Sequence, residues 1–153
     1  KHKATFIFTY VTINKKGCYV QQKEFIKKIV GVHWINRASG FDACDCWGLV
    51  ALYYKHVLNI DIPEVAGFTD FQAFEKCYSE NAHLWTQVDT AKKDGLVFTC
   101  YQGDQPSHVG VCIGHGKVLH SRGHMKAGGK VEIHSIRAVE AICGKMTFHQ
   151  YIG

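Results

Sequence analysis

The hydrophobic pattern of this chain changes its period at Asp94-Gly95, and this change constrains the fold more than any other feature. Before this point apolar residues recur at helical spacing, and after it they alternate with polar residues as in strands. Helices followed by a meander of strands predict an α+β fold, with a buried helix packed on an antiparallel sheet. At 153 residues, we expect one domain over residues 1–153.

The individual elements follow from the same periodicity. A segment that is apolar over most of its helical circumference, from Cys46 to about Leu58, predicts the buried helix. An amphipathic helix that ends before Gly31 turns Phe25, Ile26, Ile29 and Val30 inward. The predicted helices are 21–30, 46–58 and 70–78, and the predicted strands are 4–13, 96–101, 107–113, 117–121, 131–134 and 145–152.

Composition excludes several classes of function. The net charge of +5 comes from scattered lysines, whereas nucleic-acid binding requires a denser basic stripe, so we expect no nucleic-acid partner. No stretch of about 18 apolar residues is present, so we expect no membrane span. Seven cysteines cannot all pair within the chain, and their spacing shows no repeated framework. We therefore expect free thiols, synthesis in a reducing cytoplasm and, without a signal-peptide cleavage site, no export signal.

Cys46 is the candidate nucleophile because it stands at the predicted start of the buried helix, after a polar loop. The unpaired N–H groups and the macrodipole of a helix N-terminus favour an anion there. This position is a recognised way to lower the pKa of a thiol. The alternative is a buried, inert thiol, which we expect of Cys77, Cys100 and Cys143.

A nucleophilic cysteine needs a base, and His108 and His120 are the candidates. A hairpin loop centred on His115 places His120 opposite Gly110, so the two histidines become diagonal neighbours on one face. One histidine can then take the thiol proton while the other fixes its tautomer and orientation. Gly110 between them is expected to leave room for a substrate. The alternative is a pair of ordinary surface histidines.

Metal binding is a weaker possibility. Cys44-x-Cys46 and His120-x-x-x-His124 contain residue types that zinc prefers as ligands. The C-x-C gap is tighter than the usual spacing, and the sequence has no second close cysteine pair. A small zinc-binding module is therefore the weakest alternative, and we expect no metal and no cofactor.

These residues resemble a known family, the NlpC-type cell-wall cysteine peptidases, which are papain-like endopeptidases of peptidoglycan stem peptides. Residues 45–50, DCWGLV, resemble the family's D-C-S-G-L/F-V motif, and residues 94–98, DGLVF, resemble its G-D-L-V-F strand with two residues exchanged. HVGV at 108–111 and VLH at 118–120 resemble its two histidine strands, including the twelve-residue gap. The resemblance covers about residues 25–135. It implies a papain-like fold with Cys46 as nucleophile, His108 as base and His120 as the orienting residue.

Two positions depart from the family pattern. Trp34 stands where the family has a tyrosine that contributes to the oxyanion site, and its indole N–H donates with a different reach. Trp47 replaces a serine that helps to bind the free amine of the substrate, while Asp45, the other amine-binding position, is present. The expected site is therefore Cys46, His108 and His120 for catalysis, with substrate or oxyanion contacts from Trp34, Asp45, Trp47 and Gly110.

The motif DCWGLV, together with Trp34-x-x-Arg37, looks more like the family members found in bacteriophage tails. We therefore expect an enzyme of the virion tail, made in the host cytoplasm, that contacts peptidoglycan stem peptides and other tail proteins. The absence of a wall-binding repeat fits delivery by a tail. The alternative is a structural tail-tip component of the same fold with reduced or lost catalysis, because Trp34 and Trp47 change the site.

Overall fold

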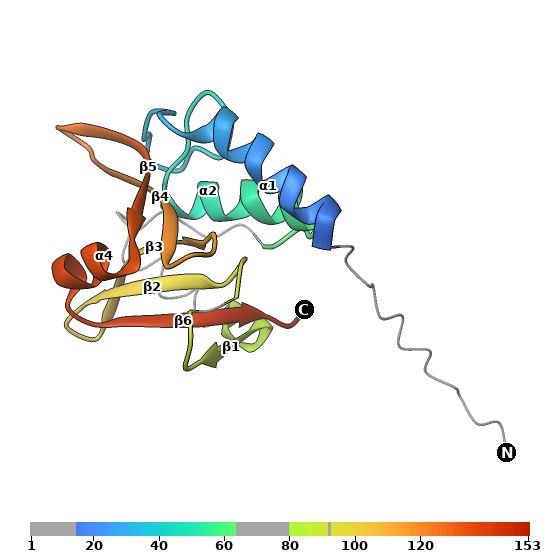
Figure 1. Cartoon of the computed structure of the whole chain (residues 1–153). Coiled ribbons are helices and arrows are strands. Elements are labelled where there is room, and N and C mark those ends of the chain that lie inside the picture. Colours follow the sequence, from blue (N-terminus) through green and yellow to red (C-terminus); the bar gives the residue numbers. More distant parts are fainter. Residues whose placement is uncertain (1–14, 64–79, 92) are drawn as a thin grey trace, which may run out of the picture.

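The structure, a computed structural model of the chain, describes residues 15–63, 80–91 and 93–153. One antiparallel sheet of six described strands, in the order β1-β6-β2-β3-β4-β5, forms its centre. Helices α1 and α2 lie over one face of this sheet and α4 lies at the other (Figure 1). The predicted α+β class is confirmed. The predicted strand 4–13 and helix 70–78 lie outside the described residues.

The strands that follow Gly95 confirm the prediction from alternation, with ends that differ by a few residues. The hairpin register is also confirmed, because Val111 pairs with Leu119 and His115 occupies the turn with a φ of 52°. A short first strand was not predicted, since its four residues gain their regular backbone only by pairing with β6. The strands are β1 (Trp85–Val88), β2 (Val97–Gln102), β3 (Gln105–Cys112), β4 (Lys117–His124), β5 (Gly128–Ser135) and β6 (Met146–Tyr151).

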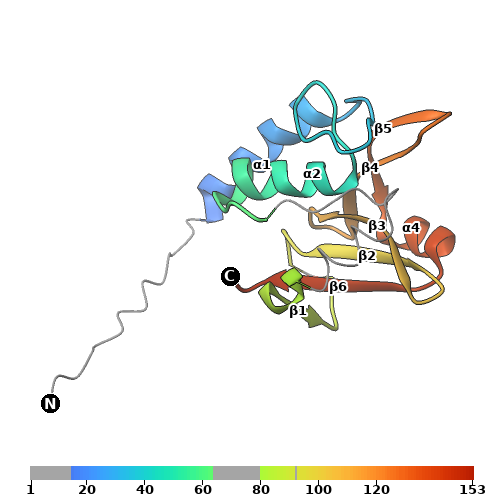
Figure 2. The same ribbon diagram turned by 180° about the vertical axis from the view of Figure 1, so that it is seen from behind.

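Helix α2 packs on β3 and β4, and α1 lies against the other side of α2 and contacts its continuation η1 (Figure 2). Helix α1 (Lys15–Ile29) begins earlier than predicted and ends where expected, because Gly31 adopts a φ of 88°. Phe25 is buried and its ring meets Tyr53 edge to face at 5.6 Å, whereas Val30 is exposed, contrary to the prediction. Val30 points outward because it lies beyond the last helical turn.

The second helix is buried, as predicted. α2 (Cys46–Tyr53) continues into the π-helix η1 (Tyr54–Leu58), and Asn59 ends the pair in the left-handed conformation with a φ of 56°. The Tyr54 hydroxyl donates to the carbonyl of Gly95, which ties this helix to the start of the sheet. The larger core cluster lies between these helices and the sheet, and it includes Leu49, Val50, Tyr53, Val57, Val97, Val109, Val111, Leu119 and Val131. Among the described residues, no helix is long and apolar enough to cross a membrane.

The opposite face of the sheet carries a helix that was not predicted. α4 (Ile136–Cys143) begins at Ser135, whose hydroxyl accepts a hydrogen bond from the N–H of Ala138. Its buried Val139 packs on a second cluster that contains Phe98 and Val118. The serine cap, the apolar residues at helical spacing and the terminal Gly144 are signals that could have indicated this helix.

A disulfide joins Cys100 of β2 to Cys143 at the end of α4. The expectation that these two cysteines are free, inert thiols is therefore wrong. The pair is 43 residues apart in the chain, and only the packing of α4 against β2 brings the two side chains together. Cys44, Cys46 and Cys112 are free and buried among the described residues.

Candidate functional site

The start of α2 is fixed by its own sequence. Asp45 is the N-cap, and one carboxylate oxygen accepts the N–H of Gly48 at 2.7 Å. The other oxygen accepts the N–H of Arg37 at 2.8 Å, so the carboxylate also holds the preceding loop. Asp45 is buried, and burial raises its pKa. Cys46 is therefore placed at the first position of the helix by a local hydrogen bond.

Gly48 is the glycine of the DCWGLV motif, and the close packing around it leaves no space for a side chain. A β-carbon at this position would collide with the carbonyl oxygen of Ala38, in the loop that crosses the helix start. The same loop also accepts a hydrogen bond from the cap residue, because the N–H of Asp45 donates to the carbonyl of Ala38 at 2.9 Å. Glycine lets the loop pass close enough to enclose the cysteine.

Cys46 is 6% exposed and lies against strand β3. The backbone N–H of Val109, the residue after His108, bonds its sulfur, and the N–H groups of Trp47 and Cys46 also favour the thiolate. Burial and the neighbouring Asp45 carboxylate outweigh these contacts and raise the pKa of the thiol above its ordinary value. The expected lowering of the thiol pKa by the helix N-terminus is therefore wrong for this protein at rest.

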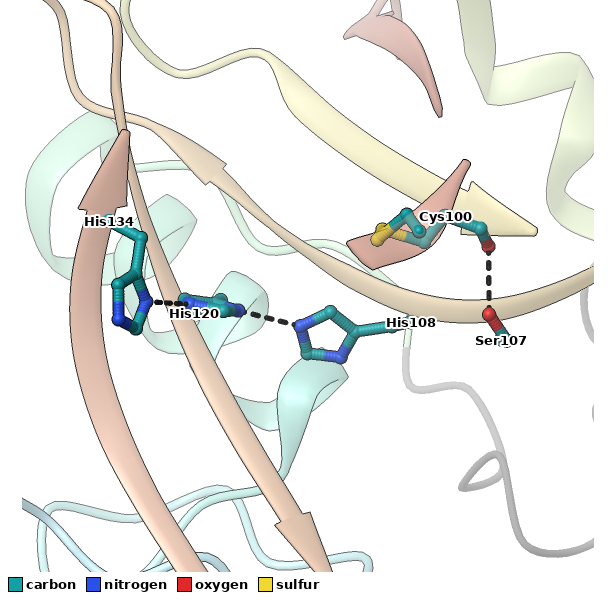
Figure 3. The surroundings of a disulfide bond; sticks show 6 residues. Cys100, Ser107, His108, His120 and His134 are labelled. Carbon is teal, nitrogen blue, oxygen red and sulfur yellow. Dashed lines mark hydrogen bonds between the residues drawn. A yellow bond between two sulfur atoms is a disulfide. The ribbon is translucent and has the colours of Figure 1, made fainter. Parts of the chain in front are cut away.

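The two predicted histidines meet as the register requires. His108 Nε2 lies 2.8 Å from His120 Nδ1, and the two rings are 5.1 Å apart in an edge-to-face arrangement (Figure 3). Strand β3 carries a β-bulge beside His108, because Cys100 pairs with His108 while the next residue of β2 pairs with Pro106. His120 is only 2% exposed.

Burial makes both histidines weak bases in the folded protein. It lowers the pKa of His108 to about 3 and that of His120 to about 4. The neighbouring imidazole lowers each pKa further, His120 acting on His108 and His134 acting on His120. The positive charge of Arg122 also lowers both pKa values. At neutral pH the imidazoles are therefore uncharged, so each can donate through one nitrogen and accept through the other.

A third histidine extends this pair and was missed in the sequence. His120 Nε2 lies 2.8 Å from Nδ1 of His134, which stands on β5 (Figure 3). The signal was the register of the β4–β5 hairpin, in which His120 pairs with Glu132 and so has His134 as a diagonal neighbour. The sequence predicts a strand over residues 131–134 but does not fix its register against β4.

The prediction that Gly110 leaves room for a substrate is wrong. A β-carbon there would lie 2.5 Å from Cε1 of Phe98 and 2.7 Å from the β-carbon of His120. The space beside Gly110 is therefore filled by these two neighbouring side chains. Glycine allows the buried imidazole of His120 to pack close to β3.

The two tryptophans at the unusual positions make contacts within the chain. The Trp34 ring lies over Gly123 of β4, where a β-carbon would collide with it, and its backbone N–H bonds Gly129. The indole N–H of Trp47 donates to the carbonyl of Pro63 at 3.2 Å, and its ring meets Trp85 edge to face at 6.0 Å. Trp47 thus packs against the end of the sheet formed by β1.

The hydrogen-bonded histidines His108, His120 and His134 form an imidazole row. This row borders a cavity of about 340 Å³ between the sheet and α4. Polar groups from His108, His120, His134 and Arg122 line one side, and apolar residues of α4 line the other. In the parts of the chain that the structure describes, no three His, Cys, Asp or Glu side chains are placed to hold a metal ion. The cavity therefore offers imidazoles for chemistry, while the Cys46 thiol is not among the residues that line it and lies in the core cluster on the α2 side.

The fold and the site define a class of protein, the papain-like α+β proteins with a cysteine at a helix N-terminus and histidines on the adjoining sheet. The chain belongs to the NlpC/P60 family, whose family model matches residues 31–142. The predicted family resemblance and papain-like fold are thereby confirmed. A search of curated protein sequences gives no significant match.

Solved structures of the same family share the fold. The NlpC/P60 domain of the peptidoglycan hydrolase SagA is 14% identical with a TM-score of 0.55, covering 90% of this chain and 97% of that one. An NLP/P60 family protein from Staphylococcus aureus, described as similar to a lipoprotein, is 15% identical with a TM-score of 0.57, covering 92% and 43%. NlpC1 from Trichomonas vaginalis is 22% identical with a TM-score of 0.52, covering 78% and 40%. The chain thus spans less than half of the latter two proteins.

Proposed function

We propose that this chain is a thiol hydrolase that cleaves amide bonds in peptidoglycan stem peptides. One observation carries the proposal: Cys46 begins a capped helix against strand β3, whose His108 is hydrogen-bonded to His120. Membership of the NlpC/P60 family and the likeness in fold to the hydrolase SagA support the substrate class. In this proposal Cys46 is the nucleophile, His108 the base and His120 the residue that orients it.

The proposed reaction starts from a neutral pair. Because burial raises the pKa of the Cys46 thiol and lowers that of His108, a resting thiolate–imidazolium pair is disfavoured. The thiol proton passes to Nδ1 of His108 as the sulfur attacks the amide carbonyl, since Nε2 is already engaged with His120. The backbone N–H of Cys46 then faces the oxyanion, and the Trp34 indole is a candidate for a further donor.

Collapse of the tetrahedral intermediate breaks the C–N bond and leaves a thioester on Cys46. The imidazolium of His108 gives its proton to the departing amine and becomes neutral again. Water then attacks the thioester, with His108 taking one of its protons and returning it to the sulfur. The products are a carboxylic acid and an amine, and the enzyme recovers its starting protonation.

We also propose that the enzyme has a weak preference for substrates with a free N-terminal amine. Both carboxylate oxygens of Asp45 already accept backbone N–H groups, and the indole of Trp47 cannot accept a hydrogen bond from an ammonium. The test compares kcat/KM for stem peptides with free and acetylated N-termini. A difference in kcat/KM of less than tenfold between the two peptides supports the proposal. A hundredfold higher kcat/KM for the free amine contradicts it.

The main experiment incubates purified peptidoglycan with the protein and identifies the fragments by mass spectrometry. Wild type is expected to release stem-peptide fragments, and Cys46→Ala to release none above background. His108→Ala should reduce the rate at least about 100-fold, and His120→Gln by less, because His120 does not itself exchange a proton with the substrate. Cys112→Ala is the matched control, since it removes another buried free thiol. Equal activity in wild type and Cys46→Ala contradicts the proposal.

A second candidate is a structural protein of the same fold without catalysis. The deep burial of Cys46 and the internal hydrogen bond of Trp47 favour it. Iodoacetamide distinguishes the two, because an active pair accelerates alkylation of Cys46 through His108. In the hydrolase, alkylation of Cys46 slows several-fold in His108→Ala at pH 7. In the structural protein, both rates are equal.

The place of action is a further part of the proposal. The phage-tail resemblance of the DCWGLV motif supports an enzyme that is made in the host cytoplasm and carried on a virion tail with other tail proteins. Virion surfaces are oxidising locations in which a disulfide such as Cys100–Cys143 persists. Mass spectrometry of purified phage particles, digested without reduction, is expected to find the disulfide-linked peptides. Their absence from such particles contradicts the tail location.

A further inference from the structure

His134 continues the hydrogen-bonded row beyond the two histidines of the proposed mechanism. The row crosses three neighbouring strands, with N···N distances of 2.8 Å from His108 to His120 and 2.8 Å from His120 to His134. Each step is diagonal in the register, so the three side chains lie on one face of the sheet (Figure 3). The His120 and His134 rings meet edge to face with centroids 5.1 Å apart.

The order of the nitrogens allows one consistent set of tautomers for the proposed mechanism. If Nδ1 of His108 takes the thiol proton, its Nε2–H must donate to Nδ1 of His120. His120 then carries its own proton on Nε2, and that N–H must find an acceptor. Nδ1 of His134 is the atom placed to accept it. Nδ1 of His120 can therefore accept from His108 only while Nε2 of His120 carries the proton and donates it to His134.

The surroundings of His120 make this last partner important. Its side chain is 2% exposed, so water cannot readily replace a lost acceptor. A buried N–H without an acceptor is destabilising, and the opposite tautomer of His120 would avoid that cost. In that tautomer Nδ1–H would face the Nε2–H of His108, and the bond between the two rings would be lost. His134 itself is exposed and stands at the open end of the row.

We propose that His134 is a positioning residue, which accepts the Nε2–H of His120 and thereby keeps His120 in the tautomer that orients His108. This inference rests on the proposed hydrolase function for its kinetic consequence. Its structural part, the tautomer of His120, is independent of any substrate. The role extends the site to three strands, each of which contributes one imidazole.

Two substitutions separate positioning from general stability. His134→Asn keeps an acceptor close to the place of Nδ1, whereas His134→Phe keeps a ring without an acceptor. His134→Phe is expected to lower kcat about tenfold with KM within twofold of wild type, in the range typical of residues that orient a ligand or base. His134→Asn should stay within about threefold. His124→Phe is the matched control, because His124 is an exposed histidine at the end of β4.

Nitrogen-15 NMR of the imidazoles gives the readout that does not need a substrate. Wild type and His134→Asn are expected to show His120 protonated at Nε2, and His134→Phe to show loss of that single tautomer. If wild type hydrolyses no peptidoglycan but the tautomer changes as expected, the hydrolase proposal fails and the positioning of His120 stands. If His134→Phe keeps the wild-type tautomer or kcat, or if His134→Asn is as impaired as His134→Phe, the inference is overturned.

Discussion

The two faces of the sheet are covered in different ways. On one face, α2 and η1 bury a large apolar cluster, and Cys46 belongs to it. On the other face, the eight-residue helix α4 covers a smaller cluster, is bound to β2 by the Cys100–Cys143 disulfide and borders the imidazole row. The first face is held by the burial of many apolar side chains. The second combines a smaller apolar cluster with a covalent link, beside a cavity that polar groups line.

The largest effect is expected from a core substitution on the α2 face. Leu49→Ala empties a fully buried site and should lower the free energy of unfolding by about 2–5 kcal/mol. Val139→Ala on α4 removes the equivalent of two methylene groups and should cost about 1.5 kcal/mol. Urea denaturation of both variants measures the difference. Equal losses would show that the two faces are held in the same way.

The second effect concerns the covalent link on the α4 face. Replacing both Cys100 and Cys143 by alanine should lower the free energy of unfolding by about 2–4 kcal/mol, because the crosslink restricts the unfolded chain. Cys112→Ala is the control, since it removes a free thiol from the same cluster. A reductant should lower Tm in wild type and leave the double variant unchanged. A wild-type Tm that does not respond to reductant contradicts the comparison.

A smaller effect concerns pH and the buried imidazoles. His108 and His120 have folded-state pKa values of about 3 and about 4, below the ordinary value of 6.5. The unfolded chain therefore binds more protons as the pH falls below 6.5, and stability decreases with decreasing pH towards the folded-state values. The expected loss is about 1 kcal/mol per histidine between pH 6.5 and pH 5.5. The double variant His108→Gln, His120→Gln should show a flatter profile in denaturation experiments at both pH values, and an unchanged slope would show that the row titrates freely.

The smallest effect is expected at the turn that connects β3 and β4. His115 is exposed and has a φ of 52°, a conformation that asparagine adopts readily. His115→Asn should therefore change the free energy of unfolding by less than about 0.5 kcal/mol and leave hydrolysis unchanged. Thermal unfolding and peptidoglycan digestion check both. A large loss of activity with an intact fold would place His115 in the site and break the assignment to His108 and His120.

Local signals in the sequence determined the parts of the site that depend on neighbouring residues. Asp45 caps α2 three residues before Gly48, so the position of Cys46 at the helix start could be predicted. The turn at His115 sets the register of β3 and β4, so the meeting of His108 and His120 could also be predicted. Caps and tight turns act over a few residues, and their geometry is therefore written in the adjacent sequence.

Only the tertiary structure decided the features that depend on distant elements. Cys100 and Cys143 bond because α4 packs on β2, and His134 joins the row because the β4–β5 register brings it beside His120. The pKa of the Cys46 thiol also depends on elements that are distant in the sequence. The helix N-terminus favours the thiolate, but the burial of that end against β3 and the adjacent Asp45 carboxylate oppose ionisation more strongly. Desolvation depends on everything that surrounds a group, so a local motif places the thiol and the whole fold sets its acidity.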